Sequence, residues 1–283
     1  MDLPPSRKAK ADLFRQLHDR KRVLVLPNAW DVASARIFEE AGFPAIGTTS
    51  AGIAYSLGYS DRERISRAEM AAAVRRIAEA VRVPVTADVE AGYGGRTSDV
   101  VETIEYMLEA GAIGVNLEDA THNRKKALFE IDVQVDRIHA ARSAAKKAGV
   151  PLVINARTDI FLLSVGSEVE RLDAVIERAS AYHQAGADCL FVPGVEDRSL
   201  IKVLVHSLPG PLNILAGPGT PSVAVLQKLG VSRLSVGSGP MRAAMGLTRR
   251  IAQELRTTGT YDALTEGAIS YTEMNQLLSR DTE

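Results

Sequence analysis

One unit recurs along this chain: a helical stretch, then a glycine, then a short apolar run. The glycines of the five instances are Gly42, Gly111, Gly149, Gly186 and Gly230. Glycine at this place is typical of the left-handed residue that ends a helix. The apolar runs do not alternate with polar residues, which is typical of strands buried on both faces of a parallel sheet. The repeated unit therefore predicts helices that alternate with parallel strands.

Eight apolar runs are predicted to be strands: Val23–Pro27, Ala45–Thr48, Val83–Ala87, Ile113–Glu118, Leu152–Ala156, Cys189–Val192, Leu212–Ala216 and Arg233–Val236. Helical patterns lie between them, among others at Arg67–Val81, Thr97–Ala110, Gln134–Ala148, Glu168–Ala185 and Pro221–Leu229. The alternation predicts an α/β fold, a (β/α)8 TIM barrel in one domain over residues 1–283, with an extra C-terminal helix after Ser270. An open doubly wound sheet is the competing arrangement. It is disfavoured because no G-x-G-x-x-G follows the first strand.

Composition and charge exclude several classes of function. The 34 basic and 35 acidic residues nearly cancel, and no segment concentrates basic residues, so no nucleic-acid partner is expected. No run of ~20 apolar residues is present to cross a membrane, and the charged N-terminus does not resemble a secretory signal. The single cysteine, Cys189, allows no intrachain disulfide and fits a reducing compartment. We expect a soluble cytoplasmic protein whose ligand is a small molecule.

Acidic residues gather where the third and fourth predicted strands end. Asp88 and Glu90 follow the third strand, Glu118 and Asp119 follow the fourth, and Arg157 follows the fifth. In a TIM barrel the catalytic side chains lie at these carboxyl ends. Converging carboxylates repel one another unless a cation or protons neutralise them. Helix caps and salt bridges explain any one of these carboxylates, but the cluster favours a hard ion, Mg²⁺ with Mn²⁺ as a substitute, over zinc.

Several longer segments carry a resemblance to a known family. They are L-P-N-A-W-D-V-A-S-A, G-T-T-S-A-G-I-A, D-V-E-A-G-Y-G, N-L-E-D, N-A-R-T-D and V-G-S-G-P-M. From Leu26 to about Leu255 the chain resembles the isocitrate lyase and phosphoenolpyruvate mutase superfamily. The resemblance implies a Mg²⁺-dependent barrel that forms or breaks a C–C or P–C bond beside a pyruvate enolate. It also implies a homotetramer or homodimer that exchanges the last barrel helix.

The same resemblance implies roles for individual residues. Asp88 is expected to ligate the metal directly, while Asp61, Glu90 and Glu118 hold its water molecules. Backbone N–H groups of Ser50, Ala51 and Gly52 are expected to bind the carboxylate and enolate oxygen of a small carboxylate substrate. Arg157 is expected to pair with a substrate carboxylate. Arg157, Asp61 and His122 are the candidate catalytic residues.

The loop after the fourth strand departs from the lyases of this family. Those lyases carry a cysteine there as general acid, whereas residues 120–128 contain none, and Cys189 is predicted to be core inside a strand. His122 is the histidine at this rim, and with Arg124, Lys125 and Lys126 it predicts a mobile lid over an anionic ligand. Cleavage of isocitrate or 2-methylisocitrate by the usual route is therefore disfavoured.

Three functions remain open on the sequence. Decarboxylation of oxaloacetate is favoured because it needs no initial base. A phosphonopyruvate or phosphoenolpyruvate mutase or hydrolase is the enzymatic alternative, since the glycine-rich segments 217–220 and 237–240 lie where barrels often bind phosphate. A metal-binding barrel without catalysis is the third reading, motivated by the missing cysteine.

Overall fold

A computed structural model describes residues 6–19, 22–123 and 125–279. Its main sheet is parallel, and its strands are neighbours in the order β1-β11-β10-β9-β8-β5-β4-β3-β2. The bounds are β1 (Leu24–Leu26), β2 (Asn28–Ala29), β3 (Ile46–Thr48), β4 (Val85–Asp88), β5 (Gly114–Glu118), β8 (Val153–Arg157), β9 (Cys189–Phe191), β10 (Leu212–Leu215) and β11 (Arg233–Ser235). Each except β2 falls on a predicted strand, β2 follows directly after the first one, and the TIM-barrel prediction is confirmed.

The segment Leu24–Ala29 closes the barrel because it is divided at Pro27, the residue where the first predicted strand ends. Proline has no backbone N–H and so interrupts a ladder of hydrogen bonds. Before it, β1 pairs with the last strand, β11; after it, β2 pairs with β3. Pro27 still accepts a hydrogen bond from the Gly47 N–H at 2.9 Å. The nine segments thus make an eight-stranded barrel.

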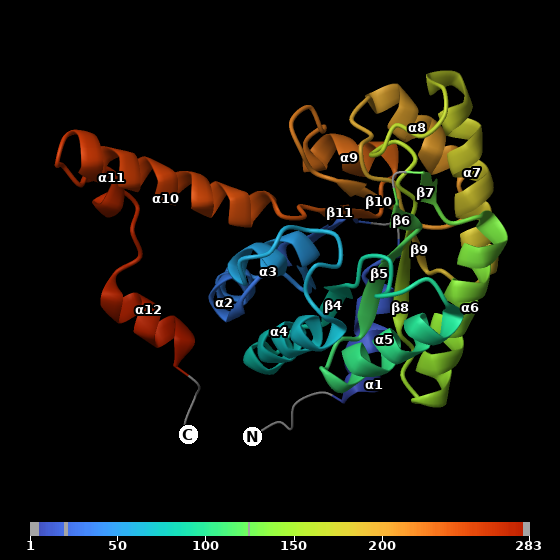
Figure 1. Cartoon of the computed structure of the whole chain (residues 1–283), viewed down its shortest axis with the longest axis horizontal. Coiled ribbons are helices and arrows are strands. Elements are labelled where there is room, and N and C mark those ends of the chain that lie inside the picture. The colour runs from blue at the N-terminus through green and yellow to red at the C-terminus, as the bar shows by residue number, and fades with distance from the viewer. Residues whose placement is uncertain (1–5, 20–21, 124, 280–283) are drawn as a thin grey trace.

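Helices connect the strands and cover the outside of the barrel (Figure 1). Their bounds are α1 (Arg7–Gln16), α2 (Val32–Glu40), α3 (Ser50–Ser56), α4 (Arg67–Ala80), α5 (Thr97–Glu109), α6 (Ile131–Lys147), α7 (Glu168–Gln184), α8 (Arg198–Ser207) and α9 (Val223–Leu229). All five glycines of the recurring unit have positive φ, as predicted. None of the helices in the described ranges is both long and apolar enough to cross a membrane.

The last barrel helix, α10 (Gly239–Thr257), departs from this arrangement. Figure 1 shows it extending away from the barrel, with α11 (Asp262–Thr265) beyond it. Only Met241 of α10 is buried. The chain then returns, and α12 (Tyr271–Leu278) lies against α2, where Arg36 donates to the Leu277 carbonyl at 3.0 Å. The predicted extra terminal helix is confirmed, but α10 leaves its own barrel uncovered on one side.

The predicted lid is an ordered hairpin at its base. Strands β6 (Ala120–Asn123) and β7 (Lys126–Leu128) pair antiparallel above the carboxyl end of β5. Arg124 lies outside the described residues. The Phe129 N–H donates to the Asp119 carbonyl at 2.8 Å and anchors the returning chain. Closure of this hairpin over a ligand stays a prediction.

Candidate active site

A cavity of about 660 Å³ opens at the carboxyl ends of β4, β5 and β8, under the β6–β7 hairpin. Carboxylates and arginines line one part of it, and aliphatic side chains of the hairpin and of the loop after β8 line another. The lining residues are Ser50, Asp61, Arg62, Glu90, Glu118, Ala120, His122, Asn123, Ala127, Arg157, Asp159, Leu162 and Leu163. The predicted acidic residues therefore line a cavity at the rim of the barrel. The cavity is large enough for an acid of more than three carbon atoms.

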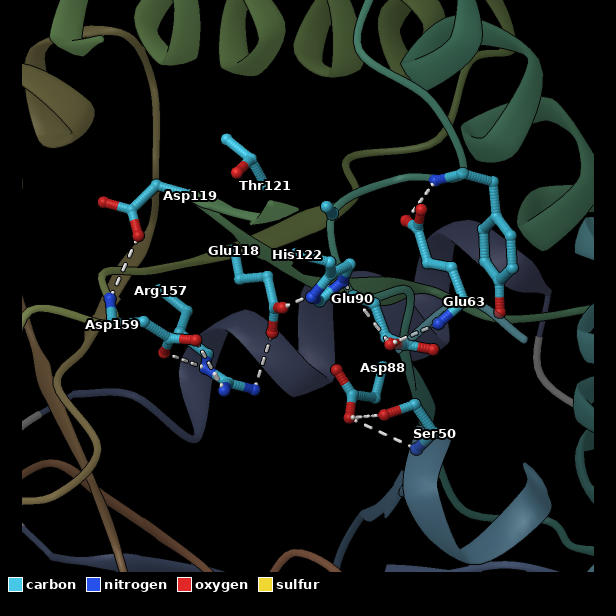
Figure 2. Close-up of polar contacts among 12 residues, drawn as sticks. Ser50, Glu63, Asp88, Glu90, Glu118, Asp119, Thr121, His122, Arg157 and Asp159 are labelled. Atoms are coloured by element: carbon cyan, nitrogen blue, oxygen red, sulfur yellow. Dashed lines mark hydrogen bonds and ion pairs between the residues drawn. The ribbon is translucent and has the colours of Figure 1, made fainter. Parts of the chain in front are cut away.

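Asp88 is the last residue of β4 and lies at the base of the acidic cluster (Figure 2). Its Oδ2 accepts hydrogen bonds from the Ser50 hydroxyl at 2.8 Å and from the Ser50 N–H at 3.2 Å. Its own N–H donates to the Thr48 hydroxyl at 3.0 Å. Its other oxygen, Oδ1, is buried without a hydrogen-bond partner among the described residues. The strand end thus fixes one carboxylate oxygen and leaves the second free for a ligand.

Glu90 follows two residues later, with a positive φ of 49°. Only 4% of the residue is exposed, and Oε2 accepts a hydrogen bond from the Glu63 N–H at 2.8 Å. Burial, together with the charges of Asp61 and Asp88, raises the pKa of Glu90 to about 8. Glu90 therefore holds a proton at neutral pH unless a cation replaces it.

Asp61 reaches the same cluster from the loop after α3. Its Oδ1 is buried and has no hydrogen-bond partner in the part of the chain that the structure describes. Burial, and then the charge of Asp88, raise its pKa. Glu63, two residues on, ties this loop to the end of β4, because its Oε1 accepts from the Tyr93 N–H at 2.7 Å. Sequence reasoning missed Glu63, whose only signal was its place beside Asp61.

Glu118 ends β5 and forms an ion pair with Arg157, which ends β8. Glu118 Oε2 lies 2.7 Å from Arg157 Nη1. Arg157 also donates to both oxygens of Asp159, from Nε at 2.6 Å and from Nη2 at 2.9 Å. Burial raises the pKa of Glu118, although Arg157 opposes this. Arg157 is therefore held in place by two carboxylates of its own chain, of which the sequence analysis did not single out Asp159.

His122 reaches the cluster from the hairpin. Its Nε2 lies 3.6 Å from Glu118 Oε1 and 3.7 Å from Glu90 Oε2, and Figure 2 shows the ring between the two carboxylates. His122 has a positive φ of 56°, in the left-handed region that non-glycine residues rarely adopt. Burial, and then the charge of Arg62, lower its pKa. The histidine predicted at this rim is thus placed against the acidic cluster.

Asp119 does not join the cluster, and its predicted convergence with the other three carboxylates is wrong. Its side chain is fully buried and turns away from the cavity (Figure 2). It accepts hydrogen bonds from the Asp159 N–H at 3.0 Å, the Tyr182 hydroxyl at 2.8 Å and Arg178 at 3.2 Å. Glu118 is the last residue of β5, Asp119 lies just beyond it, and their side chains diverge as successive side chains of an extended segment do. Asp119 joins β5 to α7.

The predicted backbone donors are only partly directed to the cavity. Ser50 lines it, but its N–H donates to Asp88, and the Gly52 N–H donates to the Thr49 hydroxyl at 3.3 Å. Ala51 is buried beside them. In segment 237–240 the Gly237 N–H, like that of the preceding Val236, donates to Asn28 Oδ1 at 2.9 Å. An amide predicted to bind phosphate is thus already engaged by Asn28.

The donor set fits a hard divalent cation. The free groups are carboxylate oxygens, two of them buried without partners among the described residues. Burial, and then their mutual repulsion, raise the pKa values of Asp61 and Glu90. In the described ranges no three His, Cys, Asp or Glu side chains lie close enough to share one ion directly. The arrangement therefore suits an ion with few protein ligands and several water molecules, which is the habit of Mg²⁺.

Comparisons with known proteins agree with this geometry. Residues 14–256 match the family model of phosphoenolpyruvate phosphomutase. A 2-methylisocitrate lyase of Halalkalibacterium halodurans is 29% identical over 99% of this chain and 93% of its own length. A Burkholderia cenocepacia crystal structure, provisionally described as a lyase/mutase, has a TM-score of 0.91 at 37% identity over 97% of both chains.

Similar solved structures also carry ligands. Oxaloacetate acetylhydrolase in complex with oxalate has a TM-score of 0.85 at 27% identity, over 98% of this chain and 95% of that one. A second structure of that enzyme holds the inhibitor 3,3-difluorooxalacetate. Phosphonopyruvate hydrolase in complex with oxalate and Mg²⁺ has a TM-score of 0.83 at 25% identity, over 95% and 94% of the two chains. The family match, the closed barrel and the acidic cluster at its carboxyl ends together show that this chain belongs to the PEP mutase/isocitrate lyase superfamily.

Proposed function

We propose that this chain is a Mg²⁺-dependent carbon–carbon lyase that acts on a small 2-oxo or 2-hydroxy diacid through a pyruvate-like enolate. Decarboxylation of oxaloacetate is the leading reaction. The observation that supports it most is the acidic cluster beside the cavity, with free buried oxygens on Asp88 and Asp61. The Mg²⁺ in the phosphonopyruvate hydrolase structure supports the choice of ion. Mn²⁺ is expected to replace it, and the cytoplasm is the expected compartment.

The carboxylates have distinct roles in this proposal. Asp88 would ligate the ion directly through its free Oδ1, while Asp61, Glu90 and Glu118 would hold its water molecules. When bound, Mg²⁺ supplies Lewis-acid stabilisation of the negative charge that develops on the substrate oxygen. The N–H groups of the Ser50–Gly52 segment, at the start of α3, would bind a substrate oxygen.

Arg157 and His122 act on the substrate in different ways. Arg157 is a planar, permanently charged group that Glu118 and Asp159 hold still, and its remaining N–H bonds can orient a substrate carboxylate. In this proposal His122 Nε2 donates a proton to the enolate carbon, in the role that the family resemblance gives to a cysteine. Oxaloacetate and one proton then give pyruvate and CO2. Solvent can deliver the same proton, so this reaction tolerates the loss of the cysteine.

Pyruvate release from oxaloacetate tests the proposal. The purified protein with Mg²⁺ is expected to exceed the rate that Mg²⁺ alone gives, and a chelator is expected to abolish the difference. Conversion of phosphonopyruvate, followed by phosphorus NMR, would instead support the mutase or hydrolase alternative. Binding of Mg²⁺ without turnover of either substrate would support the non-catalytic barrel. The engagement of Gly237 by Asn28 disfavours the phosphonate reading.

The affinity for Mg²⁺ is expected to rise with pH. Below about pH 8 Glu90 keeps a proton that the ion must displace, so Kd for Mg²⁺ should fall about tenfold per pH unit from pH 6 to 8 and then level off.

The same proton affects stability, because Glu90 binds it more tightly in the folded protein than in the unfolded chain, where the pKa is near 4.5. Stability without metal should therefore fall as pH rises from 4.5 to 8, and Mg²⁺ should restore it. Titration calorimetry checks this, and Glu90→Gln should flatten the profile; a flat profile in the wild type contradicts it.

The exposed α10 supports exchange of this helix between subunits. Met245 and Leu255 on α10 are 48% and 50% exposed, although such side chains favour burial. We propose a homotetramer, or a homodimer, in which α10 packs on the barrel of a neighbouring subunit. Light scattering after gel filtration should give a multiple of the 30.4 kDa chain mass. Leu255→Glu should shift the protein toward the monomer, and a monomeric wild type would contradict the exchange.

A further inference from the structure

Two arginines line the cavity within the described residues, and they differ in how their charge is balanced. Arg157 is paired with both Glu118 and Asp159. Its charge is therefore compensated before any substrate arrives. An anionic group far from the metal site would gain little net attraction from it. The second arginine, Arg62, lies in the loop after α3.

Arg62 is the cavity arginine that no carboxylate of the described residues holds in an ion pair. Its charge acts on the adjacent Asp61, but the residue is exposed and lines the cavity. Its charge acts on the cavity, since it contributes to lowering the pKa of His122. Guanidinium groups bind carboxylates with paired hydrogen bonds. Arg62 is thus free to bind an anion that enters the cavity.

The backbone holds Arg62 in place. Its φ is 80°, and the next residue, Glu63, has a φ of 52°. Glu63 fastens this turn to the end of β4 twice, by its N–H to Glu90 and by its carboxylate to the Tyr93 N–H. The arginine therefore extends from a fixed point beside Asp61, which faces the metal site. Because the backbone of Arg62 is fixed before a ligand binds, ordering this loop costs little entropy on binding.

We propose that Arg62 determines specificity by binding the second carboxylate of a diacid substrate, at the end remote from the metal site. This inference rests on the proposed function and narrows it to diacids over monocarboxylic 2-oxo acids. The 660 Å³ cavity leaves room for that remote end beyond a two-carbon oxalate core. The carboxylate that Arg62 holds is the one that oxaloacetate loses.

The chemistry of that loss predicts how Arg62 affects turnover. In oxaloacetate the bond between C3 and C4 breaks, its electron pair moves into the enolate, and C4 leaves as neutral CO2. C3 then takes up one proton to give pyruvate. Arg62 stabilises the carboxylate before the bond breaks, and this charge is gone when CO2 forms. Removing Arg62 should therefore raise KM without lowering kcat.

Binding of two ligands of a related enzyme, oxalate and 3,3-difluorooxaloacetate, tests the proposal without turnover. The variants are Arg62→Gln and the matched control Arg64→Gln, which changes an exposed arginine on the same loop outside the cavity. Arg62→Gln keeps a Cβ, so backbone strain at φ 80° is unchanged. With Mg²⁺ present, calorimetry should show Kd for 3,3-difluorooxaloacetate about 10- to 100-fold higher in Arg62→Gln. Kd for oxalate, which lacks the remote end, should stay within about threefold, and Arg64→Gln should match the wild type.

The outcomes separate this inference from the proposed function. Equal weakening of both ligands, no weakening of either, or the same loss in Arg64→Gln would overturn the role of Arg62. Failure of the wild type to bind 3,3-difluorooxaloacetate would overturn it as well. A wild type that binds both ligands as expected but does not release pyruvate would overturn only the proposed reaction. With oxaloacetate as substrate, a fall in kcat with unchanged KM in Arg62→Gln would also count against the proposal.

Discussion

Asp88→Asn is expected to lower Mg²⁺-dependent pyruvate release from oxaloacetate at least about a thousandfold. The change removes the negative charge that would ligate the ion, and with it the stabilisation of charge on the developing enolate. The fold should survive, because asparagine still accepts hydrogen bonds from Ser50 through its amide oxygen. A coupled assay for pyruvate measures the effect, and calorimetry with Mg²⁺ alone should show the accompanying loss of metal binding.

A matched control separates this effect from a general change of charge. Asp136→Asn removes an exposed carboxylate on α6, remote from the cavity lining, and should keep wild-type activity and Mg²⁺ affinity. If Asp88→Asn kept more than about a tenth of the activity, or bound Mg²⁺ as tightly as the wild type, Asp88 would not be the direct ligand.

Asp119→Ala is expected to lower the free energy of unfolding by about 3–5 kcal/mol. The side chain is fully buried and accepts hydrogen bonds from Arg178, Tyr182 and the Asp159 backbone. Its removal leaves the Arg178 charge without its partner and the Asp159 N–H without an acceptor. Urea unfolding followed by circular dichroism measures the change.

Two comparisons sharpen this prediction. Tyr182→Phe removes a single donor to Asp119 and should cost about 1 kcal/mol. Asp119→Asn should retain the Mg²⁺ affinity of the wild type, because the side chain turns away from the cavity. If Asp119→Asn were as stable as the wild type but bound Mg²⁺ less tightly, Asp119 would belong to the metal site. If Asp119→Ala lowered the free energy of unfolding by less than about 1 kcal/mol, the structural role assigned to Asp119 would be wrong.

The local pattern of the chain was enough to predict the barrel. Each predicted strand has an observed counterpart, since a buried parallel strand leaves a continuous apolar run that needs no knowledge of its partners. The positive φ of the helix-ending glycines could also be predicted from the sequence, because it depends mainly on the residue at that one position. Placing Asp88, Glu90 and Glu118 together also followed from sequence, because parallel strands of a barrel bring their carboxyl ends to one rim.

Tertiary structure decided which side chains at that rim face the cavity. Glu118 and Asp119 are neighbours, and the alternation along a strand sends one to Arg157 and the other to Tyr182, 63 residues away. The closure of the barrel on both sides of Pro27 likewise depends on contacts between distant segments. Sequence patterns indicate whether each residue is buried and which backbone conformation it adopts. The pairing of charges depends on side chains that the fold brings together, and only the structure shows it.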